Sequence, residues 1–429
     1  MSDKTSHSPT KKLRPITVIV PMPPSSRGGT EEYAYQLAKH FSGSRPVRIV
    51  TTSVRWGDPK HAISIGSASL ERLEAREVWE RPMLSGRAAW NQLRKEVEQA
   101  GIVQLHMPFP IVERRVTRWA RKAGVPTVLT YHMDAELGVN PQAMLPRSVS
   151  WAYREVSALP SLRDANVIIS NSWGYARASP VLSKFLPKVR VIYQGVDDER
   201  LRQIDETAVT ATLPPRRRGV PRISYVGRLV PYKGLPGLLR AAARLKAAGR
   251  PFELLIGGRG PQASELHSLT KELGLESEVR FLGFVPDSVL GAVYRDSDVV
   301  VCHSVTLLES TPITLQEAMS FGTPVVGTTL PGTEETIPND GIHGRLVRPH
   351  DIPGLADAIA ELIDNGRPSG EPTTRVWADT AKEYLHLFDE LLGPGRAKLL
   401  VPHPVPATHP VHSGEAHLPV GSPTWPRRS

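Results

Sequence analysis

The strongest constraint on the fold is an alternation of short apolar runs with helical patterns. In the first half the runs are Ile16–Val20, Val47–Val50, Ile102–Leu105, Val125–Thr130, Val167–Ile169 and Val189–Ile192. Stretches with helical spacing, such as Glu31–Phe41, separate most of them. Apolar runs without polar alternation are typical of strands buried on both faces. Strands that alternate with helices predict a parallel sheet covered by helices.

A Pro/Arg-rich break at Pro214–Gly219 interrupts this pattern, which then starts again more regularly. The second set of predicted strands is Arg222–Val226, Phe252–Ile256, Val279–Leu282, Val299–Cys302 and Pro324–Gly327, and the helices between them are Leu235–Ala248, Ser264–Leu273, Ser288–Tyr294 and Ile313–Phe321. We therefore predict an α/β chain with two parallel-sheet, Rossmann-like domains. Ligands of such sheets bind beyond the carboxyl ends of the strands, so the loops there are the places to search.

The expected domain limits follow from these patterns. We expect a disordered leader at residues 1–14, an N-terminal domain at 15–187, a C-terminal domain at 188–375, a last helix at 376–393 and a disordered Pro/His-rich tail at 394–429. Polar, proline-rich segments without apolar periodicity do not bury enough surface to fold.

Composition narrows the class of protein. The net charge of +10 suits nucleic acid, anionic lipid or phosphorylated small molecules, but no nucleic-acid-binding motif accompanies it. The single Cys302 excludes an internal disulfide and a thiolate-rich zinc site. The polar start and the lack of roughly 20 consecutive apolar residues predict a soluble, cytoplasmic protein. The basic run Arg114–Lys122 is either a solvated helix face or a docking surface for anionic lipid at the inner face of the membrane.

The segment after the predicted strand Val299–Cys302 carries the first candidate site. Thr311 and Pro312 resemble the cap and first-turn proline of a helix. The free N–H groups at Ile313 and Thr314 would then favour phosphate. Glu309 and Glu317 flank this helix start, eight residues apart, which is about 12 Å along a helix axis. They would contact different parts of one ligand, and ionised carboxylates are natural acceptors for sugar hydroxyls. A cap residue and a solvated helix residue are the structural alternative.

A second loop adds positive charge. Arg228 and Lys233 follow the predicted strand Arg222–Val226, and two cations on one such loop would neutralise a diphosphate. A basic surface loop is the alternative.

Two further motifs indicate turns more strongly than ligands. Gly258, Gly260 and Ala263 fit the G-x-G-x-x-A dinucleotide pattern, but Pro261 interrupts it and no acidic residue ends the next strand. We expect a tight turn near a nucleotide. The D-x-D sequence Asp296–Asp298 precedes a buried strand, so we expect a turn and no metal.

Taken together, these loops resemble glycosyltransferase family four, whose members have the two-domain GT-B fold. The matching pieces are E-x7-E at Glu309 and Glu317, V-G-R…K-G at Arg228 and Lys233, G-x-G-P at Gly258–Pro261, F-L-G at Phe281–Gly283, V-I-Y-Q-G-V-D at Val191–Asp197, G-G-T-E at Gly28–Glu31, and His132. The stretch Val376–Leu392 is similar to the family's last helix, which crosses back to the first domain.

The resemblance implies roles for these residues. Arg228 and Lys233 would hold the diphosphate, with the backbone of Ile313 and Thr314. Glu317 would bind ribose, Glu309 the donor sugar, and His132 would line the sugar pocket. The backbone of Gly28 and Gly29 would border the phosphates and the acceptor, and Gly258 the nucleotide. The donor would be a UDP- or GDP-sugar, used as substrate with retention and without a metal or cofactor. Catalysis would involve Glu309, His132, Arg228 and Lys233, stabilising the leaving group electrostatically.

Three residues or segments depart from the family pattern. Gln194 replaces a usual Asn, Met133 separates His132 from Asp134, and Ser310–Pro312 replaces a glycine- and phenylalanine-rich stretch. The last departure leaves the donor sugar open, and the looser match of the N-terminal half leaves the acceptor open. A nucleotide-sugar epimerase, a non-catalytic module that binds nucleotide sugars, and an NAD-dependent oxidoreductase are the alternative functions. The acceptor could be a glycan, a lipid-linked molecule or a small metabolite.

Overall fold

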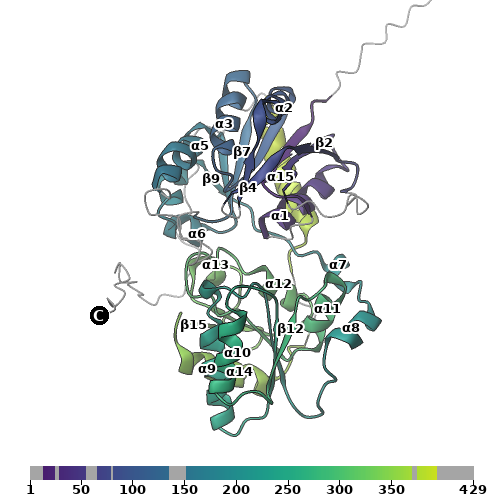
Figure 1. Ribbon diagram of the computed structural model, residues 1–429, viewed down its shortest axis with the longest axis vertical. Helices are drawn as coiled ribbons and strands as arrows, with labels where there is room; N and C mark the ends of the chain where they lie inside the picture. The colour runs from purple at the N-terminus through teal and green to yellow at the C-terminus, as the bar shows by residue number, and fades with distance from the viewer. Residues whose placement is uncertain are drawn as a thin grey trace, which may run out of the picture.

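The protein consists of two α/β lobes, stacked one above the other in Figure 1. The structure, a computed structural model, describes residues 13–24, 29–54, 65–78, 81–134, 151–369 and 374–393. The leader through residue 12, Gly28 and the tail at 394–429 lie outside these residues, so the predictions made for them stay predictions.

The N-terminal lobe is built on a parallel sheet, which has seven strands in the described part of the chain. Their order is β3-β2-β1-β6-β7-β8-β9. The strands are β1 (Ile16–Ile19), β2 (Val47–Thr52), β3 (Ser69–Leu73), β6 (Ile102–Met107), β7 (Thr127–Tyr131), β8 (Val167–Ser170) and β9 (Val189–Val191), with a separate antiparallel pair of β4 (Ala75–Val78) and β5 (Arg81–Leu84). One face is covered by α1 (Gly29–Phe41) and α15 (Trp377–Leu392). The other is covered by α2 (Gly86–Gln99), α3 (Val112–Ala123), η4 (Arg154–Ala158), α5 (Leu159–Asp164), α6 (Trp173–Ala178) and η5 (Leu182–Lys188).

The C-terminal lobe repeats the design with a parallel sheet, six-stranded over the described residues. Its order is β12-β11-β10-β13-β14-β15. The strands are β10 (Arg222–Val226), β11 (Glu253–Gly257), β12 (Val279–Gly283), β13 (Val299–Val301), β14 (Val325–Thr328) and β15 (Gly344–Val347). One face packs on α9 (Leu235–Ala247), α10 (Ala263–Glu272) and α14 (Ile352–Asn365), which lie together in Figure 1. The other packs on α7 (Asp198–Arg202), α8 (Glu206–Thr212), α11 (Asp287–Asp296) and α12 (Ile313–Met319).

The last helix, α15, belongs to the N-terminal lobe although it follows the C-terminal one in sequence. Figure 1 shows it beside α1, and Phe388 packs against Phe41 with ring centroids 5.3 Å apart. The hydroxyl of Tyr384 lies 3.1 Å from that of Tyr33, and both side chains are buried. Both ends of the described chain therefore build one hydrophobic core.

The strand pattern was predicted more accurately than the pairing of some strands. β9 pairs in parallel with β8, so the first sheet extends past residue 187, where the sequence analysis placed the domain limit. An apolar run of this length indicates a strand but not the sheet it joins. The strands β3 and β15 were missed because they are short and only half buried, which removes the apolar run that marks a buried strand.

The two lobes contact each other where α6 meets α13 (Pro331–Glu334). Just after α13, the Glu335 carboxylate accepts the backbone N–H groups of Trp173, at 2.9 Å, and of Gly174. It also accepts the Tyr193 hydroxyl at 3.1 Å. One carboxylate of the C-terminal lobe thus satisfies the first free N–H groups of a helix in the other lobe.

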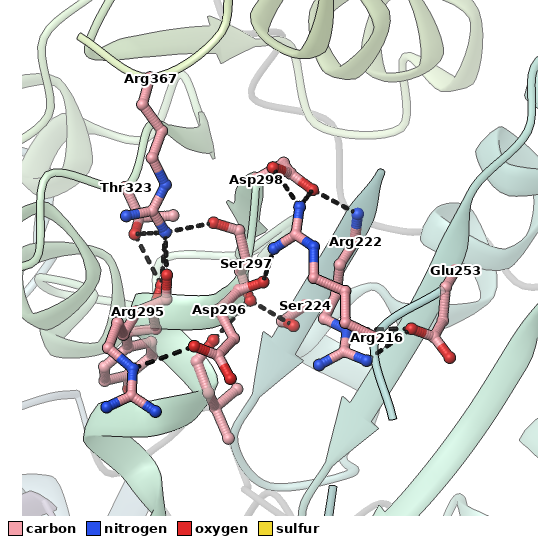
Figure 2. Close-up of polar contacts among 12 residues, drawn as sticks. Arg216, Arg222, Ser224, Glu253, Arg295, Asp296, Ser297, Asp298, Thr323 and Arg367 are labelled. Atoms are coloured by element: carbon pink, nitrogen blue, oxygen red, sulfur yellow. Dashed lines mark hydrogen bonds and ion pairs between the residues drawn. The ribbon is translucent and has the colours of Figure 1, made fainter. Parts of the chain in front are cut away.

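Hydrogen bonds and ion pairs between polar side chains link the amino ends of strands in the C-terminal lobe (Figure 2). Asp298 lies just before β13, and its two carboxylate oxygens accept hydrogen bonds from Arg216 Nη2 at 2.8 and 2.6 Å. One of these oxygens also accepts the backbone N–H of Arg222 at 2.6 Å. The buried Arg222 guanidinium in turn pairs with Glu253 at 2.9 Å. The D-x-D sequence therefore lies at the amino ends of the strands, where Asp296 ends α11 and Asp298 directly precedes β13. The expected strand entry is present, but a helix end takes the place of the expected turn.

Candidate active site

Lys233 and Glu309 form a buried ion pair at the carboxyl ends of the C-terminal strands. The ammonium of Lys233, from the loop after β10, contacts Glu309 Oε2, and the two side chains are 14% and 10% exposed. Ser304, just after β13, donates to the same oxygen at 2.7 Å. Burial opposes the charged form of Lys233, but the carboxylate of Glu309 and other nearby acidic groups favour it, and the pKa of Lys233 lies well above its usual value. Lys233 is therefore charged at neutral pH.

Local backbone geometry explains why a glycine follows Lys233. Gly234 has φ +66°, and a Cβ there would lie 2.1 Å from the carbonyl oxygen of His303. Only glycine allows this left-handed conformation and this close approach together. The loops after β10 and β13 are thereby held in contact, which brings Lys233 to Glu309.

Arg228 lies on the same loop, close after the end of β10. Its side chain is exposed, and its charge lowers the pKa of Glu31 in the first turn of α1, although burial is the larger influence and raises that pKa overall. The interaction places Arg228 close to the start of α1, which begins at Gly29. Arg228 and the α1 start are thus brought together, whereas Gly28 lies outside the described residues.

Glu317 lies on α12 and is 6% exposed. Tyr294 donates its hydroxyl to Glu317 Oε2 at 2.8 Å, and Arg200 Nη2 donates to Oε1 at 3.3 Å. Burial raises the pKa of Glu317 to about 7, while Arg200 and the Tyr294 hydrogen bond oppose the shift. The buried carboxylate is thus poised between its charged and neutral forms.

The start of α12 differs in detail from the prediction. Pro312, not Thr311, is the cap residue, and no side chain caps the helix. The Thr311 hydroxyl is buried without a hydrogen-bond partner among the described residues, and the Thr311 carbonyl accepts Gln194 Nε2 at 3.4 Å. A proline can precede a helix because it lacks the N–H that would otherwise need a partner. Ile313 and Thr314 are the first two residues of α12, as predicted, and they are half buried.

His132 lies at the carboxyl end of β7 in the N-terminal lobe. It is 7% exposed, and its Nε2 atom lies 2.9 Å from Nδ1 of the fully buried His106. Burial lowers the pKa of His132 to about 3, so the ring is neutral at physiological pH. The edge of the ring packs against Tyr33 with centroids 5.1 Å apart. A neutral imidazole here can give or accept one hydrogen bond but carries no charge.

Gly258 and Gly260 hold the loops after β10 and β11 together. A Cβ on Gly258 would lie 1.8 Å from the carbonyl oxygen of Gly227, and one on Gly260 would lie 2.3 Å from that of Leu229. The backbone N–H of Leu229 also donates to the backbone carbonyl of Arg259 at 3.0 Å. These glycines therefore have a packing reason of their own, independent of any ligand.

Arg200, Ser304 and His106 join the site, but sequence reasoning missed all three. Arg200 is 117 residues from Glu317 along the chain, and nothing in its local sequence indicates that distant partner. Ser304 follows directly on the predicted strand Val299–Cys302 and could have been found as a polar residue at a strand end. His106 is polar within an apolar strand, which is a signal that was available but overlooked.

Sequence patterns of known families match both lobes. The pattern described as Glycosyltransferase Family 4 matches residues 27–200, and the one described as Glycosyl transferases group 1 matches residues 215–384. The chain belongs to glycosyltransferase family four. The second of these matches includes Arg228, Lys233, Glu309 and Glu317.

Curated relatives and solved structures agree with this membership. D-inositol 3-phosphate glycosyltransferase of Nocardia farcinica is 31% identical over 287 residues, covering 62% of each chain. The 2-deoxystreptamine glucosyltransferase of Streptomyces kanamyceticus is 28% identical over 259 residues, 58% of this chain and 64% of that one. The alignments therefore span less than two thirds of these relatives' length.

Two solved structures show the fold. Sucrose-phosphate synthase from Thermosynechococcus elongatus has a TM-score of 0.62 at 21% identity, covering 90% of this chain and 98% of that chain. Anabaena HepE in complex with UDP and glucose has a TM-score of 0.65 at 17% identity, covering 88% and 100%. The family-four chain therefore has the GT-B fold.

The described residues contain no group of three or more His, Cys, Asp or Glu side chains that could hold a metal ion. No helix among them is long and apolar enough to span a membrane.

Proposed function

We propose that this protein transfers a sugar from a UDP- or GDP-sugar to an acceptor, with retention at the anomeric carbon. The observation that carries the proposal is the buried Lys233–Glu309 pair, which sits at the carboxyl ends of the strands and on the motif residues of the family. A charged lysine in a water-poor site stabilises a leaving diphosphate strongly. Its carboxylate partner is an acceptor for sugar hydroxyls.

The other parts of the site have complementary roles in this proposal. Arg228 and the start of α1 flank the diphosphate from opposite lobes, and the N–H groups of Ile313 and Thr314 add to its binding. Glu317 binds the ribose hydroxyls, and the neutral His132 contacts the sugar. Gly29 borders the phosphates, and Gly258 keeps the nucleotide-side loop in place. The nucleotide sugar is the substrate, and the chemistry proposed here uses no resident metal or cofactor.

A donor screen tests this function. The purified chain is incubated with UDP-, GDP- and ADP-sugars and the products are read by mass spectrometry. We expect slow hydrolysis of one donor, and its loss in Lys233→Ala. The matched control is Lys246→Ala, an exposed lysine of α9 that pairs with Glu278. An epimerised donor would instead favour an epimerase, and nucleotide binding without turnover would favour a non-catalytic module.

We also propose a lipid-linked acceptor presented at an anionic membrane surface. Arg118, Arg121 and Lys122 are exposed on α3, and each basic residue near such a surface contributes about 1 kcal/mol. Part of the basic run is engaged within the lobe, since Arg114 and Arg121 both pair with Asp164 and Arg115 lies over the Trp90 ring. Binding to vesicles of phosphatidylglycerol at low salt tests the idea, and equal binding by an Arg118→Gln, Lys122→Gln variant would contradict it.

A further inference from the structure

We propose that Arg200 is a positioning residue for the donor nucleotide, which keeps the Glu317 carboxylate oriented and negatively charged for the ribose hydroxyls. The inference rests on the proposed function, because it takes Glu317 as the ribose contact. Arg200 lies on α7, outside every motif on which the function was argued.

The hydrogen bonds of Glu317 leave a defined pair of acceptors. Arg200 Nη2 donates to Oε1 at 3.3 Å, and the Tyr294 hydroxyl donates to Oε2 at 2.8 Å. A carboxylate has about four lone-pair sites, two on each oxygen. One site on each oxygen is therefore occupied and one remains. Two neighbouring acceptors match the two adjacent hydroxyl donors of a ribose ring.

The single guanidinium of Arg200 interacts with four carboxylates. Besides Glu317, Arg200 Nη1 lies 3.0 Å from Asp287 Oδ1 on α11, and Nε lies 3.7 Å from Asp197 Oδ2 at the start of α7. Glu32 of α1 also interacts with the Arg200 charge. Without the cation, the buried Glu317 would face Glu32 and Asp287 alone. It would take up a proton and lose acceptor capacity.

The position of Arg200 is set from both lobes. Asp197 accepts the backbone N–H of Arg200 at 3.2 Å and caps the short helix α7. Its other carboxylate oxygen accepts Gln36 Nε2 of α1 at 2.6 Å, and Gln36 also bonds Glu32 at 2.8 Å. A continuous set of contacts thus runs from α1 through Asp197 and Arg200 to Glu317. An arginine fixed in this way loses little further freedom when the nucleotide binds.

Calorimetric titration of the full chain tests the proposal. The ligands are UDP, GDP and ADP with their 2′-deoxy counterparts, and the variants are Arg200→Gln and Arg200→Lys. Wild type should prefer the ribose form by roughly 10-fold or more, the worth of a hydrogen bond to a charged group. Arg200→Gln should bind the ribose form at least about 10-fold more weakly at pH 7.5 and lose most of that preference. Arg200→Lys, which keeps the charge, should be intermediate.

Two readouts separate positioning from mere packing. The loss in Arg200→Gln should shrink as the pH is raised toward 9, since Glu317 then ionises without its cation. Arg202→Gln, a charge-matched change on the same helix, should behave as wild type. Circular dichroism melting checks that each variant folds, and Arg200→Lys carries the comparison if Arg200→Gln does not.

Three outcomes would overturn the assignment. The assignment would be wrong if Arg200→Gln kept wild-type affinity and ribose preference. It would also be wrong if Arg200→Gln weakened binding of the ribose and 2′-deoxy forms equally at every pH. Failure of wild type to bind any of the nucleotides would refute the proposed function itself, and with it this inference. The first two outcomes leave the proposed function standing, so the two failures are distinguishable.

Discussion

Glu309 and Glu317 stand eight residues apart in one segment and are almost equally buried, at 8% and 6% exposed, yet they are held differently. Glu309 has a lysine ammonium and a serine hydroxyl on the same oxygen. Glu317 has a tyrosine hydroxyl and one guanidinium that it shares with other carboxylates. Burial alone does not decide the charge of a carboxylate, because the partner decides how much of the lost hydration is replaced.

The difference suits two separate tasks. A carboxylate held by a lysine ammonium and a serine hydroxyl has a fixed position, as a contact to the donor sugar beside the diphosphate requires. One with a pKa of about 7 changes its charge near neutrality, so its affinity for hydroxyl groups depends on pH. Each of the following experiments addresses one side of this contrast.

Glu309→Gln should produce the largest change. Turnover of the donor should fall by roughly 10²–10³-fold, as when one electrostatic group of an active site is removed. Nucleotide affinity should change by less than about 3-fold, because the proposed contact of Glu309 is with the sugar and not with the nucleotide. Steady-state kinetics and UDP titration measure the two quantities. A variant with weakened UDP binding and unchanged turnover would reverse the roles given to the two carboxylates.

Glu317→Gln should stabilise the protein at alkaline pH. The folded-state pKa of Glu317 is raised from 4.5 to about 7, so the folded state binds this proton more tightly than the unfolded one. Stability therefore declines as the pH rises through this window, by up to about 3 kcal/mol. The amide carries no such penalty. Urea unfolding should show the variant to be more stable at pH 8 and nearly equal at pH 4.5. A pH-independent difference would mean that Glu317 is not buried with a raised pKa.

UDP binding by the wild-type protein should weaken below pH 7. For each pH unit below 7, the affinity for UDP should fall by up to about 10-fold, because a protonated Glu317 loses acceptor capacity. The β-phosphate of UDP also titrates, so Glu317→Gln measured over the same range provides the baseline. Parallel pH profiles for the two proteins would show that Glu317 is not the group responsible.

Tyr294→Phe should have the smallest effect. It removes the hydrogen bond to Glu317 Oε2 and so raises the pKa of Glu317 further. A net loss of about 1 kcal/mol in UDP affinity at pH 7 is expected. The midpoint of the pH profile should move upward by less than that of Arg200→Gln. An unchanged midpoint would indicate that the Tyr294 hydroxyl does not influence the carboxylate.

The sequence was sufficient for the fold, and it placed the motif residues of the C-terminal lobe on loops and a helix beyond the strands, whereas their roles stay predictions. The alternation of buried strands and helices predicted both sheets, because buried parallel strands leave long apolar runs. Lys233 and Glu309 were each placed on a loop after a predicted strand, and the pairing of β10 with β13 brings these two loops side by side. Their direct ion pair was not predicted, since it depends on the backbone contact that Gly234 allows.

Contacts between distant segments were beyond sequence reasoning. Arg200 lies near Glu317 because α7, α11 and α12 pack together against the C-terminal sheet. Gly258 was assigned to the nucleotide, but its close approach to Gly227 is a packing requirement that a glycine pattern does not reveal. The bonds from Arg216 to Asp298 likewise could not be read from two charged clusters 82 residues apart.

Because α15 returns to the N-terminal lobe, the hydrophobic core of that lobe can be completed only after the described strands of the C-terminal lobe have been synthesised. The face of the first sheet beneath Tyr33 and Phe41 is covered by Tyr384 and Phe388. Both residues follow the described strands of the C-terminal lobe in sequence, so they are synthesised after those strands. The N-terminal lobe therefore completes its core only after the described strands of the C-terminal lobe have been made, and a chain that stops before Trp377 would leave an aromatic core open to solvent.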